Sequence, residues 1–153
     1  MRAWRLVKRR HLAGAFDGEG ARRYGGRWNS PGRAVVYLGS TPAVAALEVL
    51  VHNARTTLLD EQFVIVPVDV PDELVLELDP TVLPDHWHDP TDTTAAAAVG
   101  DAWLDSAASV ALKVPSAVTL LDLNVLLNPA HPDMTRVTIG EPRAWRFDER
   151  LAR

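Results

Sequence analysis

The stretch GGRWNSPGRAVVYLGSTPAVAALEVL, residues 25–50, contains the strongest local structural signals in the chain. Residues 33–38 are mostly apolar or aromatic and are bounded by glycines, which predicts a β-strand. The Ser-Thr-Pro sequence at 40–42 supplies a cap and a proline for the first helical position, so we expect a helix from there to about His52. Apolar residues repeat every three or four positions around this helix, which predicts that it is buried on most sides.

Arg27, Tyr37 and Glu48 are the residues of this stretch that an ordinary hydrophobic core would least require. A carboxylate on a buried helix must be paired, hydrogen-bonded or used in chemistry, and a structural ion pair with an N-terminal arginine is one alternative for Glu48. Arg27 fits either a loop cation stacked on Trp28 or a bidentate phosphate ligand. Tyr37 fits either an aromatic strand end or a stacking surface for a flat ring. We expect the three side chains to line one pocket.

The rest of the chain predicts several short strands and one further helix. Pro67 should bend or bulge its strand, residues 94–109 have a helical pattern, and residues 9–32 and 80–92 predict loops. Because strands and helices do not alternate, the order predicts a single α+β domain over residues 1–153 with mostly antiparallel pairing. Apolar or alternating segments, most of which predict strands, lie at residues 3–7, 62–70, 74–78, 110–114, 118–127, 135–139 and 144–147.

The composition is that of one globular domain, with 153 residues, 47% hydrophobic and 24% charged. The net charge of −4 argues against general binding to nucleic acid, although the basic residues gathered in the first 33 positions could hold one small anionic ligand. No apolar run reaches the roughly 18 residues of a membrane span, and no signal peptide is evident. Without cysteine there is no disulfide and no thiol nucleophile. The cytoplasm, without membrane association, is the expected location.

Common catalytic and ligand-binding motifs are absent from the sequence. It lacks a GxGxxG turn after a strand, a GxxxxGK[ST] phosphate loop, an HExxH zinc motif and a GxSxG nucleophile elbow. His86 and His88 form an HxH pair in an acidic, proline-rich loop, but no third ligand lies in clear register, so no metal site is predicted. Ser116 at a strand end and Asn128 before a proline are, taken alone, ordinary turn residues.

Motifs such as YGGRWNSPG, VVYLGST, ALEVLVH and NVLLNPAHPD follow one another along the chain. In this order they resemble one known family, the RES domain. They extend from about Trp4 to Phe147, nearly the whole chain, and the segment 82–94 matches least. RES domains are the toxin components of bacterial toxin–antitoxin pairs in which the antitoxin is an Xre-like helix-turn-helix protein. The resemblance implies such a partner, contact with DNA through that partner, and a homodimer within a larger complex as one arrangement. The motifs are WRL near the start, YGGRWNSPG, VVYLGST, ALEVLVH, GDAWL, LKVPSAV and NVLLNPAHPD.

The resemblance also implies a fold related to ADP-ribosyltransferases of the diphtheria-toxin type, with NAD as the substrate and no cofactor. Family members are similar in destroying NAD by hydrolysis or phosphorolysis, and some transfer ADP-ribose to a protein. Water, inorganic phosphate and a protein side chain therefore remain alternative acceptors, and a non-catalytic domain that binds its antitoxin is the alternative outside the enzymes. The residues carried over by position are Arg27, Tyr37, Glu48 and Ser116 as catalytic residues, with Arg5, Arg27, Tyr37 and Asn128 as NAD-binding residues.

These residue types suit cleavage of the nicotinamide–ribose bond. That reaction passes through an oxocarbenium-like transition state, as glycoside cleavage does. Glu48 would stabilise the developing positive charge and hold the ribose hydroxyls. Arg27 and Arg5 would bind the pyrophosphate. Tyr37 would stack on nicotinamide, and Ser116 would orient Glu48 or the ring amide.

Overall fold

One eight-stranded β-sheet organises the protein in a computed structural model that describes residues 1–53 and 55–152. The spatial order is β4-β5-β6-β2-β1-β3-β7, and β8 also pairs with β3. Among the described pairs, β4–β5 is parallel and the others are antiparallel. The predicted α+β class with mostly antiparallel pairing is confirmed. The strands are β1 (Arg2–Lys8), β2 (Val36–Gly39), β3 (Phe63–Asp69), β4 (Val75–Glu77), β5 (Ala111–Pro115), β6 (Leu123–Leu127), β7 (Thr138–Ile139) and β8 (Arg143–Trp145).

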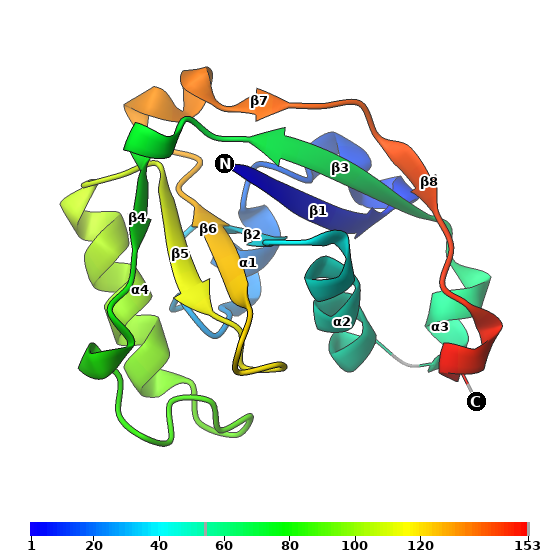
Figure 1. Ribbon diagram of the computed structural model, residues 1–153, viewed down its shortest axis with the longest axis horizontal. Helices are drawn as coiled ribbons and strands as arrows, with labels where there is room; N and C mark the ends of the chain where they lie inside the picture. Colours follow the sequence, from blue (N-terminus) through cyan, green and yellow to red (C-terminus); the bar gives the residue numbers. More distant parts are fainter. Residues whose placement is uncertain (54, 153) are drawn as a thin grey trace.

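The sheet turns sharply between β2 and β1. In Figure 1, β4, β5 and β6 run down one side of the molecule, and β1 and β3 cross the other side in a different direction. The two halves meet at the pair Trp4–Gly39. A Cβ atom on Gly39 would lie 2.4 Å from the backbone nitrogen of Ala45, so glycine allows the end of β2 to approach the first turn of the next helix.

Helices cover different parts of this bent sheet. The second helix packs mainly on β1 and β2, and the fourth buries Ala96 and Trp103 against side chains of β5 and β6. No helix among the described residues is long and apolar enough to cross a membrane. The α-helices are α1 (Glu19–Tyr24), α2 (Pro42–His52), α3 (Arg55–Asp60) and α4 (Thr94–Ser106), and turns of 3-10 helix occur at Arg9–Gly14, Asp72–Leu74, Pro80–Val82, Pro132–Arg136 and Glu149–Ala152.

Strand β3 is the buried centre of one half, and it pairs with β1 without the bulge that was one of the expectations for Pro67. β1 and β3 pair without a skipped residue from Arg2–Asp69 to Lys8–Phe63. The carbonyl of Pro67 accepts a hydrogen bond from the Gly140 backbone on the opposite edge, at 2.8 Å. The proline nitrogen faces that same edge, and Pro67 lies between the β3 residues that pair with β7 and those that pair with β8. Its missing N–H therefore costs no bond to β1.

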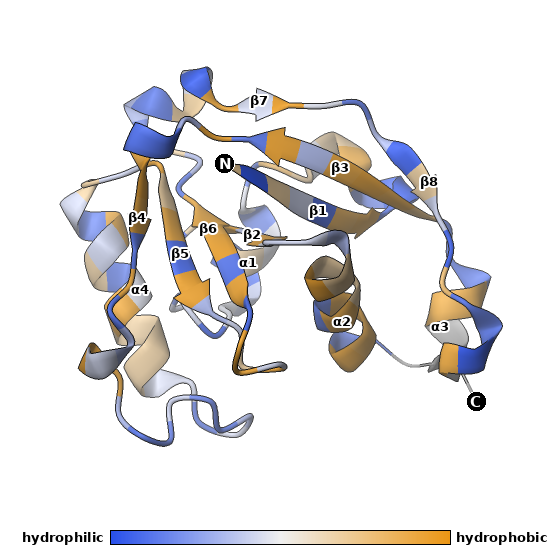
Figure 2. Cartoon of the chain, in the orientation of Figure 1, coloured by the Kyte–Doolittle hydropathy of each residue, from blue (hydrophilic) through white to orange (hydrophobic). Residues whose placement is uncertain are grey.

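Helix α2 begins as predicted, but its expected burial is wrong. The Thr41 side chain accepts a hydrogen bond from the Val44 backbone at 3.1 Å, Pro42 occupies the first turn, and the helix ends at His52. Val44 is buried, whereas the side chains of Leu47 and Val51 are 38% and 55% exposed. Figure 2 shows this largely hydrophobic helix projecting from one side of the sheet. The helix packs on the sheet along one face, and apolar residues on its other faces are exposed to solvent.

Several other element boundaries differ from the predicted ones. Residues 9–32, predicted as a long loop with at most a short helical turn, contain the six-residue helix α1, where Glu19 forms ion pairs with Arg22 and Arg23 one turn along. Helix α4 ends three residues early because Ala107 takes a left-handed conformation, with φ of 47°. Within the apolar segment 118–127, only the second half forms a strand. Residues 135–139 and 144–147 yield the short strands β7 and β8.

The contact between α4 and the loop at residues 25–30 gives a stability prediction. A Cβ atom on Gly100 would lie 1.8 Å from the backbone oxygen of Trp28, which is buried. Gly100→Ala should therefore force α4 away from this loop and lower the unfolding free energy by at least about 2 kcal/mol, or roughly 4–8 °C in Tm.

Gly20→Ala is the matched control, because a Cβ atom there meets open space. Alanine favours the helix at that position, so Tm should stay the same or rise slightly. Thermal unfolding followed by circular dichroism measures both variants. An unchanged Tm in Gly100→Ala would show that the close approach of α4 is wrong.

Candidate functional site

A groove of about 1430 Å³ is lined by residues of β1, β2, α1, α2 and α4 and of the adjoining loops. It is larger than the roughly 300–1,000 Å³ of a typical small-molecule pocket, so an extended ligand can fit. Five of the six residues predicted for the site lie in or against it. The groove is lined by Arg5, Arg27, Tyr37 and Glu48. Ser116 is not part of the lining, but its hydroxyl donates a hydrogen bond to Glu48. Asn128 is also absent from the lining.

Glu48 is held by two neutral hydrogen-bond donors. Its Oε1 atom accepts from the Asn124 side chain at 2.6 Å and from the Ser116 hydroxyl at 3.0 Å. The side chain is 27% exposed, and Oε2 lies 4.0 Å from the imidazole of His52, one turn along α2. Among the described residues, Glu48 has no arginine partner, so the alternative of a structural ion pair is not observed. One carboxylate oxygen is fixed, and the other is available to the groove.

The turn after β5 fixes Ser116. Its hydroxyl oxygen accepts hydrogen bonds from the backbone nitrogens of Val118 and Thr119, at 3.2 and 3.3 Å. Its own backbone donates to Asp122 at 2.9 Å, which closes the turn. Because the oxygen already accepts from these amides, the hydroxyl proton is directed at Glu48. Of the two roles considered for Ser116, this position favours orienting the Glu48 carboxylate.

Tyr37 anchors the loop that carries Arg27. Its hydroxyl donates to the Asn29 side chain at 2.6 Å and accepts from the Trp28 backbone at 3.0 Å. Burial raises the pKa of Tyr37 above its ordinary value. The phenol therefore stays neutral, and its ring lines the groove beside Gly26, where a Cβ atom would lie 2.5 Å from the hydroxyl. No proton-transfer role follows from this arrangement.

Two guanidinium groups in the groove have no carboxylate partner among the described residues. Arg27 donates to the backbone oxygens of Trp87 and Asp89, at 2.8 and 3.1 Å. Arg5 donates to the Tyr37 backbone oxygen at 2.7 Å, and its Nε is buried without a partner. Burial lowers the pKa of Arg5 to about 10, so it remains a cation at neutral pH.

Most other arginines of the described chain are neutralised. They form ion pairs on the surface, as Arg2 with Asp69, Arg10 with Glu61, Arg22 and Arg23 with Glu19, Arg33 with Asp105, Arg136 with Glu73, and Arg150 with Asp148. The two unneutralised guanidinium groups in one groove are suited to an anionic ligand, because arginine binds phosphate oxygens in a bidentate manner.

The assignment of Asn128 to the site is not supported by its position. Asn128 follows β6, where its side chain accepts from the Ala130 backbone at 3.1 Å and closes a turn. It lies four residues beyond Asn124, roughly 13 Å along the strand. Asn124, at the opposite end of β6, contacts Glu48 instead. Sequence reasoning missed Asn124, although a buried polar residue inside an apolar strand is the same kind of signal as Glu48 on an apolar helix.

The HxH pair does not form a metal site in the described part of the chain. His86 and His88 are exposed, and His88 reaches the groove rim. No group of three or more described His, Asp or Glu side chains is placed to hold a metal ion.

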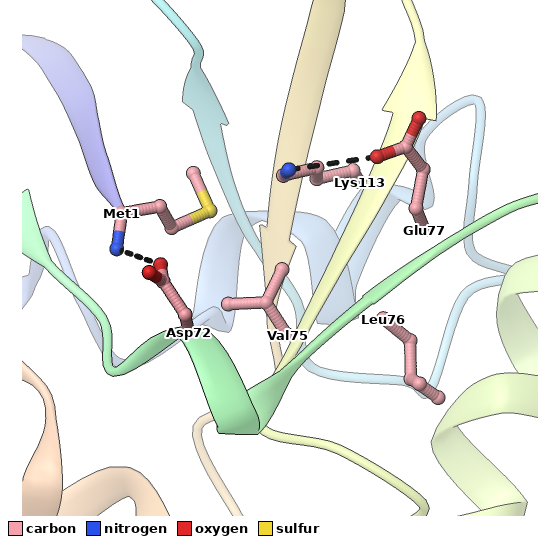
Figure 3. A pocket seen from close by; sticks show the side chains of 6 residues that line it. All are labelled: Met1, Asp72, Val75, Leu76, Glu77 and Lys113. Carbon is pink, nitrogen blue, oxygen red and sulfur yellow. Dashed lines mark hydrogen bonds and ion pairs between the residues drawn. The ribbon is translucent and has the colours of Figure 1, made fainter.

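A second, smaller pocket of about 290 Å³ lies at the β4–β5 edge of the sheet. Its charged groups are already paired: the N-terminal ammonium lies 2.5 Å from Asp72, and Lys113 lies 3.5 Å from Glu77. Figure 3 shows both pairs around Val75. This pocket shares no residue with the groove and offers no unpaired charge to a ligand.

The raised pKa of Tyr37 predicts a pH dependence of stability. The unfolded chain loses the phenolic proton at about pH 10, before the folded protein does, so the contribution of Tyr37 is present below that pH and is lost as pH rises further. Tyr37→Phe should lower Tm at pH 8, since the Trp28 amide loses its acceptor, and the Tm difference from the parent should shrink above about pH 10. Arg5 titrates in the same way in the parent and in Tyr37→Phe, so it does not contribute to the difference in Tm. A difference that stays constant to pH 11 would contradict the prediction.

Comparison with known proteins agrees with these features. The RES domain family model matches residues 2–148. The chain is similar to Toxin Res of Yersinia enterocolitica, with 37% identity over 99% of each chain, and to the Prs ADP-ribosylating toxin of a Sphingobium species, with 34% identity over 98% of this chain and 96% of that protein. Its structure is similar to a chain of the M. tuberculosis MbcT–MbcA toxin–antitoxin complex, with a TM-score of 0.79 at 22% identity over 99% of this chain and 86% of that one. The structural match agrees with the predicted α+β fold, and the chain belongs to the RES domain family.

Proposed function

We propose that this protein is the toxin of a toxin–antitoxin pair and that it cleaves the nicotinamide–ribose bond of NAD. The observation that carries the proposal is a carboxylate, Glu48, fixed by Ser116 and Asn124 in the same groove as two guanidinium groups without carboxylate partners. The names of the similar proteins support the toxin role, since each is called a toxin or occurs in a toxin–antitoxin complex.

The reaction suits the arrangement around Glu48. The bond between ribose carbon and nicotinamide nitrogen breaks with its electron pair going to the ring, which leaves as a neutral base. The ribose then carries oxocarbenium-like positive charge. The carboxylate of Glu48 stabilises that charge, and its free oxygen accepts hydrogen bonds from ribose hydroxyls. An oxygen of water or inorganic phosphate bonds to the ribose carbon, and its proton passes to solvent.

The other groove residues bind and orient the dinucleotide. Arg27 and Arg5 bind the pyrophosphate, because both are cations without a carboxylate partner in the described chain. The Tyr37 ring stacks on nicotinamide, and its neutral hydroxyl keeps the Arg27 loop in place. Ser116 orients Glu48. NAD is the substrate, and none of these steps requires a cofactor.

A second candidate function is mono-ADP-ribosylation of a protein. The 34% identical Sphingobium relative carries the name ADP-ribosylating toxin, and the groove is open enough for a protein side chain to replace water as the acceptor. We further propose an Xre-like helix-turn-helix antitoxin as partner, DNA contact through that antitoxin, action in the cytoplasm, and a homodimer as a possible unit of a larger complex. A non-catalytic antitoxin-binding domain would have no need for the fixed Glu48.

The test of the acceptor is incubation of NAD with the pure, antitoxin-free protein, in phosphate buffer and in phosphate-free buffer, followed by proton NMR. Nicotinamide release in phosphate alone, together with a phosphorylated ADP-ribose, identifies phosphorolysis. Equal release in both buffers identifies hydrolysis. No release by the folded protein contradicts NAD cleavage with small acceptors and favours the protein acceptor or a non-catalytic domain.

Removing the charge of Glu48 should abolish cleavage without unfolding the protein. In Glu48→Gln, the amide oxygen can still accept from Ser116 and Asn124, but the negative charge is lost. The rate should fall by at least about 100-fold. Glu141→Gln, at an exposed residue outside the groove lining, is the control and should keep full activity. A folded Glu48→Gln variant with parental activity would refute the role.

Arg27→Ala should raise KM for NAD by about tenfold or more, because a charge-assisted hydrogen bond to phosphate is lost. Arg33→Ala is the matched control: it removes a nearby arginine that is paired with Asp105 on the surface, and it should leave KM unchanged. Steady-state kinetics and Tm are measured for both. If Arg27→Ala lowers Tm and leaves KM alone, the residue is structural.

A further inference from the structure

The groove continues past the Glu48 region to an end that none of the predicted site residues explains. This end is lined by one face of α1 and one face of α4. Figure 1 places α4 on the opposite side of β5 and β6 from α2, the helix that contains Glu48. The lining residues are Gly20, Ala21 and Tyr24 of α1, with Thr94, Ala97, Ala98 and Asp101 of α4.

The residues that line this end lie on one face of each helix. The four α4 positions recur at intervals of three and four, so they form a single stripe facing the groove. Most of them are small, which leaves room between the helices. Tyr24 ends α1 at the rim, and Asp101 lies on the last turn of the α4 stripe.

Tyr24 has the properties of an unused stacking surface. Its side chain is 83% exposed, although tyrosines usually bury most of their ring. It forms no hydrogen bond or aromatic contact with the described residues. The backbone on either side is nevertheless fixed, since Gly25 donates to Ala21 at 2.8 Å and Gly32 donates to Arg22 at 2.7 Å. The ring is therefore presented to solvent from a rigid position.

Asp101 has one carboxylate oxygen in use and one available. Its Oδ1 accepts from the Ser30 backbone at 3.0 Å, which ties α4 to the loop that carries Arg27. Among the described residues, Oδ2 has no partner, and Asp101 lines the groove. Unlike Asp105 one turn along, which forms an ion pair with Arg33, Asp101 forms no ion pair with the described residues.

We propose that this end binds the adenosine half of NAD, with Tyr24 stacked on adenine and Asp101 accepting a hydrogen bond from the adenosine ribose. The inference rests on the proposed function, because Glu48 must lie at the nicotinamide ribose for the chemistry to occur. The pyrophosphate then lies at Arg27 and Arg5, and the adenosine is directed toward the opposite end. A carboxylate at the adenosine ribose favours the 2′-hydroxyl of NAD and repels the 2′-phosphate of NADP.

The test of Tyr24 compares cleavage of NAD with that of nicotinamide mononucleotide, which contains the same scissile bond but lacks the adenosine half. Tyr24→Ala should lower kcat/KM for NAD about tenfold and leave kcat/KM for the mononucleotide within twofold. Tyr24→Phe keeps the ring and should behave as the parent with both substrates. An equal effect of Tyr24→Ala on the two substrates, or no effect on NAD, would overturn the inference.

The test of Asp101 compares NAD with NADP. The parent should prefer NAD, and Asp101→Asn, which keeps an oxygen for the Ser30 amide, should reduce that preference at least fivefold. Ala102→Ser, at the exposed neighbouring position outside the groove lining, should leave the preference unchanged. A preference that Asp101→Asn does not alter would remove Asp101 from the adenosine site.

Binding of ADP-ribose, measured by calorimetry, separates this inference from the proposed reaction. ADP-ribose contains the adenosine and pyrophosphate but no bond to cleave. If the protein cleaves neither NAD nor the mononucleotide, the proposed reaction fails, and weaker ADP-ribose binding by Tyr24→Ala still supports the adenosine site. Unchanged binding by that variant refutes it.

Discussion

The carboxylate of Glu48 links helix α2 to the β5–β6 hairpin through two hydrogen bonds. Helix α2 packs mainly on β1 and β2, at the turn of the sheet, whereas Ser116 follows β5 and Asn124 lies in β6. A single oxygen accepts from both. Without that acceptor, the buried amide of Asn124 would lose its partner. The same contact that holds α2 over the groove also leaves the second oxygen facing it.

The arginines of the groove make folding less favourable, because they lack carboxylate partners among the described residues. Most surface arginines of the described chain pair with carboxylates, whereas Arg5 and Arg27 donate only to backbone oxygens among the described residues. Burial of Arg5 is unfavourable enough to lower its pKa to about 10. Local arrangements that weaken folding are common at functional sites, where a ligand supplies the missing partner. An acidic protein therefore contains a small cationic region suited to a pyrophosphate.

The accuracy of the sequence predictions depended on the range of the interactions involved. Thr41 and Pro42 start α2 through contacts within one turn, and this start was predicted correctly. The burial of α2 was not, because periodicity shows that a face is apolar and does not show what covers it. Asn128 was carried over from a motif, yet the contact with Glu48 comes from Asn124, at the other end of β6.

The sequence by itself determined the α+β class, the start of α2 and the presence of a carboxylate that needed a partner, since these follow from local propensity, spacing and the cost of a buried charge. The tertiary structure alone decided that the sheet turns between β2 and β1, that the partners of Glu48 are Ser116 and Asn124, and that α1 and α4 extend the groove. The physical reason is distance along the chain: Glu48 meets residues 68 and 76 positions away. Contacts of that range are set by how strands pair and pack, which no local pattern specifies.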